Sequence, residues 1–478
     1  MSEKAASRAL LGKGSIYTLA TVAQLAGALL VQPALTRLLS KADFGVAALG
    51  VVVTATVGLL ITLGLPGVIT REHFTKSQDG TGPIVTLSVV LAVLLGGVAF
   101  AAGPLWAPDG EFTAPLMIAT GTGVSYGVIV ACQAVQRARE EAGRFVLVVA
   151  INILGGQLAG LAAIVLIDRT ATVYLAGVAA GSLVGAALAL YWARPTLTGL
   201  RDWETLRRWF AIALPTVPHM AALYLMTAGD RFIVTHLRGE AANAEYSVAY
   251  LIGALGITLV AAANNAWAPL IYGTPNERRW QVLATTTQDM LRVGVVVAGG
   301  LAMTAPLALW IVADSGKYNL PDLVPVVALT ALATVPYVLY VASAHVLFWT
   351  GKTTALMWVT PVAVTVNLVA KALVLPRFGF VGAAVVTVVA YALLALMIGS
   401  VRRTLAEVPW RRRWPELAVA TVLCVAGALI PPGWAGNVVR ALVTVALIGV
   451  LGLVARQLLA DRRSALAPEE QPSTAGQS

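Results

Sequence analysis

Uninterrupted apolar segments of about 20 residues recur along this chain from residue 14 to residue 459. At a rise of about 1.5 Å per residue, a helix of that length crosses the hydrocarbon core of a bilayer. Hydrophobic residues make up 58% of the chain and charged residues 12%, and no loop is long enough to form a separate catalytic domain. The function must therefore lie in what the membrane helices enclose.

The segments predict an all-α polytopic membrane protein with about fourteen transmembrane helices, because only helices and closed barrels satisfy backbone polar groups in lipid. Barrel strands would alternate over shorter segments. The thirteenth segment is short, since Pro415 and Pro431 flank it. The predicted helices span residues 14–35, 44–69, 84–106, 114–135, 145–167, 173–192, 210–235, 244–271, 290–312, 323–349, 355–375, 381–401, 416–430 and 438–459.

Lysines and arginines are distributed unevenly between alternate loops. With the N-terminus inside, the cytoplasmic segments hold about three times as many as the outer loops, as the positive-inside rule requires. Both termini are therefore predicted to be cytoplasmic. The net charge of +10 then reflects a surface beside anionic lipid headgroups and indicates no nucleic-acid partner. The outer loops keep Arg37, Lys41, Arg169, Arg238, Lys317, Arg377 and Arg440.

The two ends of the given sequence and its cysteines are expected to form no further folded module. The first apolar segment is too long for a cleavable signal peptide and lacks a small-residue cleavage motif. The tail 464–478 is rich in Pro, Ser, Glu and Gln, which predicts disorder. Cys132 and Cys424 fall in different predicted helices, where they are expected to be small apolar filler outside any disulfide framework.

Two segments of the chain resemble each other across six predicted helices. Residues 36–49 and 235–251 both open with Thr-x-Leu, pass a short charged hairpin, and re-enter with an acid, an aromatic, a small residue and Val-Ala. Such a parallel repeat is typical of two six-helix bundles around a central cavity. The predicted domains are residues 1–199 and 200–405 for the two bundles, 406–463 for two additional helices, and 464–478 for the disordered cytoplasmic tail.

Signatures of catalysis and of cofactor binding are missing from the sequence. Gly351-Lys352-Thr353 resembles the end of a P-loop, but Val346 stands where that motif needs glycine and the segment follows a membrane helix. The four histidines lack metal-ligand spacing. Gly123-Val-Ser-Tyr-Gly127 fits the Gly-x-Ser-x-Gly pattern, but it falls inside predicted helix 114–135 and not at the strand-to-helix turn that makes a nucleophile elbow. We therefore expect no enzymatic activity, no catalytic residue, no cofactor and no metal. The short outer loops also argue against a glycan polymerase or ligase.

Ionisable residues inside membrane helices are costly and mark candidate functional sites. Asp230 and Arg231 either form a local ion pair or snorkel to the interface, or contribute a gate or an anion contact. Lys371 either snorkels or offers its charge to a diphosphate. His219 either packs helices through a hydrogen bond, couples protons or contacts a headgroup. Several neutral amides also lie inside predicted helices, where they either form hydrogen bonds between neighbouring helices or face the cavity. They are Gln24, Asn152, Asn264, Asn265 and Asn367.

Two prolines, Pro215 and Pro218, predict a kinked or broken helix near His219. Irregular backbone at that depth is tolerated where it lines a cavity, so the helix 210–235 is the best candidate for a moving, substrate-facing element. Residues 201–210 before it predict a short amphipathic interfacial helix. The run Trp410-Arg-Arg-Arg-Trp414 predicts a similar anchor, whose role is either positional or lipid-selective.

The chain resembles the polysaccharide transporter (Wzx-type oligosaccharide flippase) family of the multidrug/oligosaccharidyl-lipid/polysaccharide exporter superfamily. The resemblance covers nearly the whole chain in helix count and layout. It is carried by Lys13-Gly-Ser-Ile-Tyr17, by Leu39-Ser-Lys-Ala-Asp-Phe-Gly45, by Leu214-Pro215 with Asp230-Arg231, and by Glu245-Tyr-Ser-Val-Ala249.

The resemblance implies a V-shaped pair of six-helix bundles with two extra C-terminal helices, in a bacterial cytoplasmic membrane. It also implies translocation of a polyprenyl-diphosphate-linked oligosaccharide for cell-surface polysaccharide assembly, with lipids, a polymerase and glycosyltransferases as partners. Cations suit such a headgroup, and those expected to contact it are Arg37, Arg71, Arg231 and Lys371. Deep cations are fewer here than in the more basic family members.

Two other functions are compatible with the sequence. A cation-coupled multidrug exporter of the same superfamily would need a buried, titrating acid in one bundle. Asp230 is the only acid more than two residues from the end of a predicted helix. A non-transporting scaffold for glycan assembly would make the polar residues and the prolines of helix 210–235 incidental.

Overall fold

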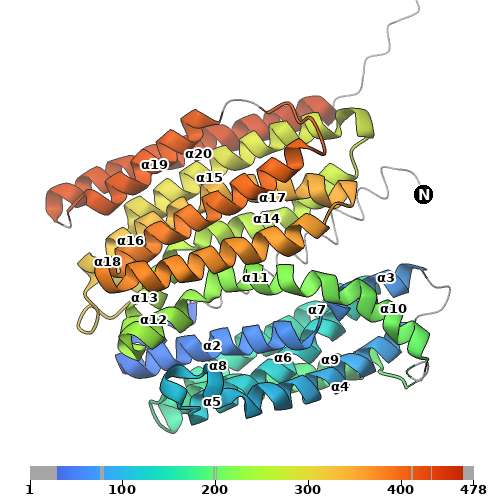
Figure 1. Cartoon of the computed structure of the whole chain (residues 1–478). Coiled ribbons are helices and arrows are strands. Elements are labelled where there is room, and N and C mark those ends of the chain that lie inside the picture. The colour runs from blue at the N-terminus through green and yellow to red at the C-terminus, as the bar shows by residue number, and fades with distance from the viewer. Residues whose placement is uncertain are drawn as a thin grey trace, which may run out of the picture.

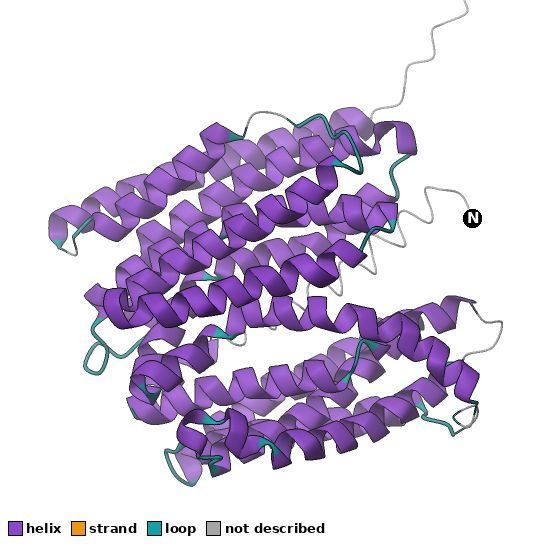
Figure 2. Cartoon of the chain, viewed as in Figure 1, coloured by secondary structure: helices purple, strands orange, loops and turns teal. Residues whose placement is uncertain are grey.

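The computed structural model describes residues 30–75, 80–197, 200, 202–410, 413–431 and 433–466. Every regular element in these ranges is a helix, as Figure 2 shows. Within them, eleven helices are long and apolar enough to cross a membrane. The predicted all-α polytopic fold is thus confirmed, and the chain is a multi-pass membrane protein. Most of predicted helix 14–35 lies outside the described residues, although residues 30–38 are helical.

The first half of the chain forms one group of packed helices, which we call the N-lobe. Small residues bring its helices close together: a Cβ at Gly177 would overlap the backbone of Gly160 on the neighbouring helix. The N-lobe comprises α2 (Lys41–Ile61), α3 (Leu65–Thr75), α4 (Thr81–Ala101), α5 (Gly103–Trp106), η1 (Pro108–Gly110), α6 (Ala114–Ala138), α7 (Ala142–Val149), η2 (Ala150–Gly155), α8 (Gly156–Leu166) and α9 (Ala171–Ala193).

The second half forms the C-lobe, which follows the connecting helix α10 (Trp203–Ala213). Two further helices, α19 (Trp414–Leu429) and α20 (Trp434–Leu466), pack on its α15 and lie on the side away from the N-lobe (Figure 1). The C-lobe comprises η3 (Leu214–Thr216), α11 (Val217–Ala228), α12 (Asp230–Arg238), α13 (Glu240–Gly253), α14 (Leu255–Tyr272), α15 (Asn276–Val312), α16 (Leu320–Leu332), α17 (Thr334–Thr350) and α18 (Thr354–Arg403).

Two breaks in helical geometry agree with the sequence. Predicted helix 210–235 is interrupted at η3, where Pro215 lies, and again at Gly229 between α11 and α12. The predicted pair 355–375 and 381–401 forms one assigned element, α18, with a non-helical Gly379 (φ 60°, ψ −155°) inside it. Only glycine adopts that conformation without strain, which explains why the helices separate there.

The loops gather at two ends of the molecule. Figure 1 shows the turns after α5, α12, α15 and α19 at its left end, and those after α14 and α17 at its right end, where α3 also ends. The sequence assigned the first set to the outside and the second to the cytoplasm, so the fold is consistent with the predicted alternation. We call the left end the outer end and the right end the inner end.

Candidate functional site between the two lobes

The lobes contact each other at the outer end through the two hairpins of the internal repeat. Lys41 of the first hairpin forms an ion pair with Glu245 of the second. The Asn243 side-chain amide donates a hydrogen bond to the Gly45 carbonyl (2.9 Å). A Cβ at Gly45 would overlap the Glu240 carbonyl oxygen, so glycine is what allows α2 and α13 to approach this closely. We call these contacts the outer seam.

The end of the first membrane helix extends the outer seam. The Thr36 hydroxyl donates to the Val312 carbonyl (2.7 Å), and Lys317 Nζ donates to the carbonyls of Arg37 (2.7 Å) and Leu39 (2.8 Å). Arg37, one of the predicted headgroup residues, donates through NH1 to the carbonyls of Pro33 and Ile311. The structure therefore places Arg37 in the contact between the lobes.

A buried ion pair links α12 and α18 inside the C-lobe. Lys371 Nζ lies 2.5 Å from Asp230 Oδ1, and the two residues are 1% and 0% exposed. The Tyr246 hydroxyl donates to the other carboxylate oxygen, Oδ2, at 2.6 Å. Asp230 therefore pairs with Lys371 rather than with its neighbour Arg231. The charge of Lys371 is held by a carboxylate and does not reach the interface.

Arg231 is left without a carboxylate partner among the described residues. Its NH1 donates to the Thr227 carbonyl (3.1 Å), and its guanidinium carbon lies 5.0 Å from the centre of the Tyr250 ring. The side chain is half-buried. An arginine has five N–H donors, so most of those of Arg231 are available to another acceptor.

The surroundings of Arg231 include the facing lobe. Tyr224, on α11, lies within electrostatic range of both Arg231 and Tyr126, which belongs to α6 of the N-lobe. The Tyr224 hydroxyl also lies 3.5 Å from the Val52 carbonyl of α2. Tyr224 thus lies at the junction of the lobes, with Arg231 and Tyr126 near enough to act on it electrostatically.

His219 connects two helices of the C-lobe. Its Nδ1 lies 2.9 Å from the hydroxyl of Thr360, so it bonds α11 to α18 just after the η3 break. This contact agrees with the helix-packing interpretation of His219. Proton coupling and headgroup contact by this residue stay predictions.

The remaining predicted residues do not join one constellation. Arg71 lies exposed on α3, and Asn152 lies in η2, a π-helical turn packed against α9 at Gly185. Asn264 and Asn265 lie on α14. Asn367 is fully buried one turn before Lys371, and neither atom of its amide has a partner in the described part of the chain. Gln24 lies outside the described residues.

Sequence reasoning missed Tyr224, Tyr246 and Tyr250 as members of the site. Tyr246 and Tyr250 are one helical turn apart on α13, and their ring centres are 5.6 Å apart. The available signal was the spacing of four residues between these two tyrosines within the second copy of the repeat.

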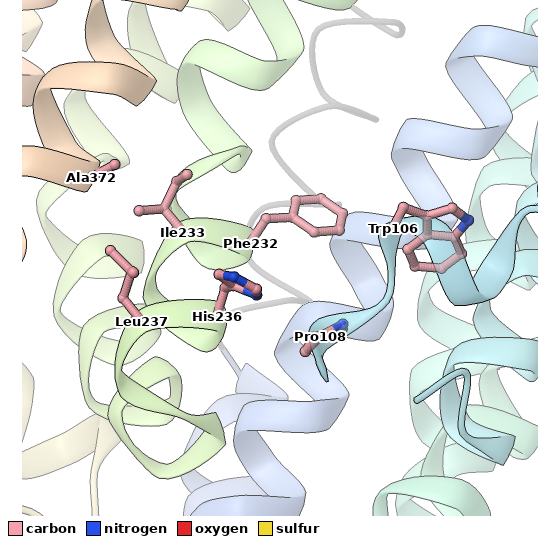
Figure 3. Close-up of a pocket in the computed structure, with 7 residues that line it drawn as sticks. All are labelled: Trp106, Pro108, Phe232, Ile233, His236, Leu237 and Ala372. Carbon is pink, nitrogen blue, oxygen red and sulfur yellow. The ribbon is translucent and has the colours of Figure 1, made fainter. Parts of the chain in front are cut away.

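An apolar pocket of about 250 Å³ opens where the lobes meet near the outer end. Trp106 and Pro108 line it from the N-lobe, and Phe232 and His236 from α12 (Figure 3). In Figure 3 the Phe232 ring extends from α12 toward Trp106. The pocket lies at the junction of the lobes, and its apolar lining is suited to a hydrocarbon chain.

The arrangement of lobes is that of known membrane transporters. The lipid II flippase MurJ in an inward closed conformation is similar with a TM-score of 0.70 and 11% identity, over 93% of this chain and 99% of that chain. An inward-facing multidrug resistance MATE transporter of the MOP superfamily gives 0.57 and 15%, over 82% and 94%. A MATE transporter of Vibrio cholerae gives 0.59 and 12%, over 84% and 97%. At these identities the likeness shows the fold.

Sequence comparison gives the family. The model of the polysaccharide biosynthesis protein family matches residues 10–273, which is more than half of the chain. The chain belongs to this family, which confirms the predicted polysaccharide family. No curated protein sequence is significantly similar to it.

Proposed function

We propose that the protein is a flippase that translocates a polyprenyl-diphosphate-linked oligosaccharide across the bacterial cytoplasmic membrane for cell-surface polysaccharide biosynthesis. The family description and the fold shared with a lipid flippase support this proposal. Both termini lie in the cytoplasm, and no bond is made or broken.

The observation that carries the proposal is the guanidinium of Arg231 at the junction of the lobes, which has no carboxylate partner among the described residues. Its neighbour Asp230 is held by Lys371 and Tyr246, so that carboxylate does not compete for it. Arginine binds phosphate oxygens through two parallel N–H donors, and a half-buried site strengthens such bonds. A diphosphate is the part of the substrate that Arg231 fits.

The outer seam supports a mechanism of alternating access. The lobes are joined at the outer end by Lys41–Glu245, Asn243–Gly45 and the contacts of Lys317. Release to the outer leaflet requires those contacts to separate. The headgroup lies between the lobes, while the polyprenyl tail stays in lipid beside them, where the apolar pocket at Trp106 and Phe232 offers it a compatible surface.

The buried ion pair disfavours the cation-coupled multidrug exporter. That function needs an acid that exchanges its cation, and Asp230 is fully buried with the ammonium of Lys371 as a fixed counter-ion. The non-transporting scaffold is separated from the flippase by the following experiment.

The test is the leaflet that holds the lipid-linked oligosaccharide in cells lacking the protein, complemented with variants. A membrane-impermeant glycan probe reports the outward-facing fraction. Arg231→Ala removes hydrogen bonds between charged groups worth about 1.5–3 kcal/mol, so we expect translocation to fall about tenfold or more. Arg169→Gln, on an exposed outer loop, is the matched control and should export normally.

Normal surface glycan and normal outward labelling with Arg231→Ala would remove Arg231 from the site. Unchanged leaflet distribution in the deletion strain, with reduced polymer, would instead favour the scaffold.

A further inference from the structure

Two arginines converge on one tryptophan at the inner end of the C-lobe. Arg402 lies in the last turn of α18, and Trp410 and Arg413 lie in the connection that leads to α19. The guanidinium carbons of Arg402 and Arg413 lie 5.0 Å and 3.7 Å from the centre of the Trp410 ring. Both cations therefore contact the same π-system, which attracts each of them.

No carboxylate neutralises this pair within the described residues. The acid nearest in sequence to Arg413, Glu416, accepts a hydrogen bond from the Gln288 side-chain amide. Arg402 is only 7% exposed, so its charge is largely removed from bulk water. Burial and the neighbouring charge of Arg402 lower the pKa of the Arg413 guanidinium to about 10. Two like charges are thus held together without a counter-ion.

The same three residues carry N–H donors without acceptors. Arg402 Nε, one terminal nitrogen of Arg413 (NH2) and Trp410 Nε1 are all buried and unpartnered. A buried donor that lacks an acceptor is costly, and folded proteins pair nearly all of them. Two cations with unpartnered donors beside one indole indicate an acceptor that is negatively charged and has several oxygens.

The position of the cluster identifies the source of such an acceptor. Figure 1 shows the C-terminal end of α18 toward the inner end and on the side away from the N-lobe. The start of α19 packs on α15. That end is the predicted cytoplasmic face, where the headgroups of anionic lipids gather and where Trp and Arg are typical of the interface. The cluster is separate from Arg231 and the junction of the lobes.

We propose that Arg402, Trp410 and Arg413 form a binding site for a phosphate group at the cytoplasmic membrane surface, as an anionic phospholipid headgroup presents it. The planar guanidinium groups donate to the phosphate oxygens, and the Trp410 indole N–H completes the set. The bound phosphate neutralises the arginine pair and fixes the connection between α18 and α19. This site is independent of the proposed transport activity.

The test is native mass spectrometry of the purified full-length protein, offered phosphatidylglycerol, phosphatidylcholine or inorganic phosphate. We expect the wild type to retain phosphatidylglycerol in preference to phosphatidylcholine. Arg402→Gln and Arg413→Gln should each weaken that retention about tenfold, the loss expected for one charge-assisted contact. Arg403→Gln is the matched control, because Arg403 has the same charge, adjoins Arg402 and is exposed.

Retention of inorganic phosphate by the wild type alone, with no preference between the lipids, would support the site and assign it to free phosphate. Equal retention of every probe by the wild type and both site variants would overturn the proposal, and so would an equal loss with Arg403→Gln. Should Arg402→Gln fail to fold, Arg402→Lys keeps the charge without the planar fork and is expected to retain less phosphatidylglycerol than the wild type.

Discussion

Replacement of Lys371 by methionine isolates the buried ion pair of the C-lobe. The substitution keeps an unbranched side chain of similar length but leaves the Asp230 carboxylate in a site that is 0% exposed, with the Tyr246 hydroxyl as its remaining partner. Breaking a buried pair by removing one ion costs about 3–5 kcal/mol, because the other charge stays uncompensated. We expect the free energy of unfolding of Lys371→Met in detergent to fall by that amount.

The double variant Asp230→Asn with Lys371→Met removes both charges. Replacing a whole buried pair by neutral groups is often close to neutral, so we expect most of the lost stability to return. A double-mutant cycle, measured by denaturant titration with tryptophan fluorescence, gives the interaction energy of the two side chains. Lys352→Met, at an exposed position in the turn between α17 and α18, serves as the control for loss of a lysine.

The reasoning would be refuted if Lys371→Met lost less than about 1 kcal/mol, or if the double variant were as unstable as the single one. Glycan export by the double variant then distinguishes two roles of Lys371, the ion pair with Asp230 and direct contact with a diphosphate. Because its charge is held by Asp230, we expect the double variant to export the glycan. A stable double variant without export would return Lys371 to the diphosphate site.

Two other predictions concern packing at the outer end. Gly45→Ala should separate α2 from α13, because the added Cβ overlaps the Glu240 carbonyl. Distances between spin labels on the two sides of the outer seam should therefore lengthen. Gly97→Ala adds a Cβ to open space and should leave those distances unchanged. Arg440 is 3% exposed, and its guanidinium donates hydrogen bonds to the carbonyls of Ala302, Gly427 and Ile430. Arg440→Met removes these bonds and should lower the free energy of unfolding by about 2–3 kcal/mol. Proteolysis between α19 and α20 should become faster, while cleavage elsewhere stays unchanged.

The fold was largely predictable because a lipid environment leaves a chain few choices. Segments long enough to cross the bilayer must satisfy their backbone internally, so the length of each apolar run predicts a helix. Pro215 predicted the break at η3 for an equally local reason, since proline lacks the N–H that a helix needs. The non-helical Gly379 lies between predicted helices 355–375 and 381–401, three residues after Pro376.

The partners of polar side chains were not predictable in the same way. Asp230 and Arg231 are neighbours in sequence, but adjacent residues on a helix point in different directions. Asp230 therefore forms its ion pair with Lys371 of α18, and Arg231 has no carboxylate partner among the described residues. The repeat was visible in the sequence, yet only the fold shows that its two hairpins contact each other through Lys41 and Glu245.

The burial of the two cysteines of the chain allows the movements of the lobes to be studied with thiol labels. Cys132 lies on α6 of the N-lobe and Cys424 on α19, and both are 0% exposed. A thiol reagent added to the folded protein therefore meets no native surface cysteine. Reporter cysteines placed on either side of the outer seam can be labelled or cross-linked in the otherwise unaltered sequence, and the opening of the lobes can be followed without first removing the native thiols.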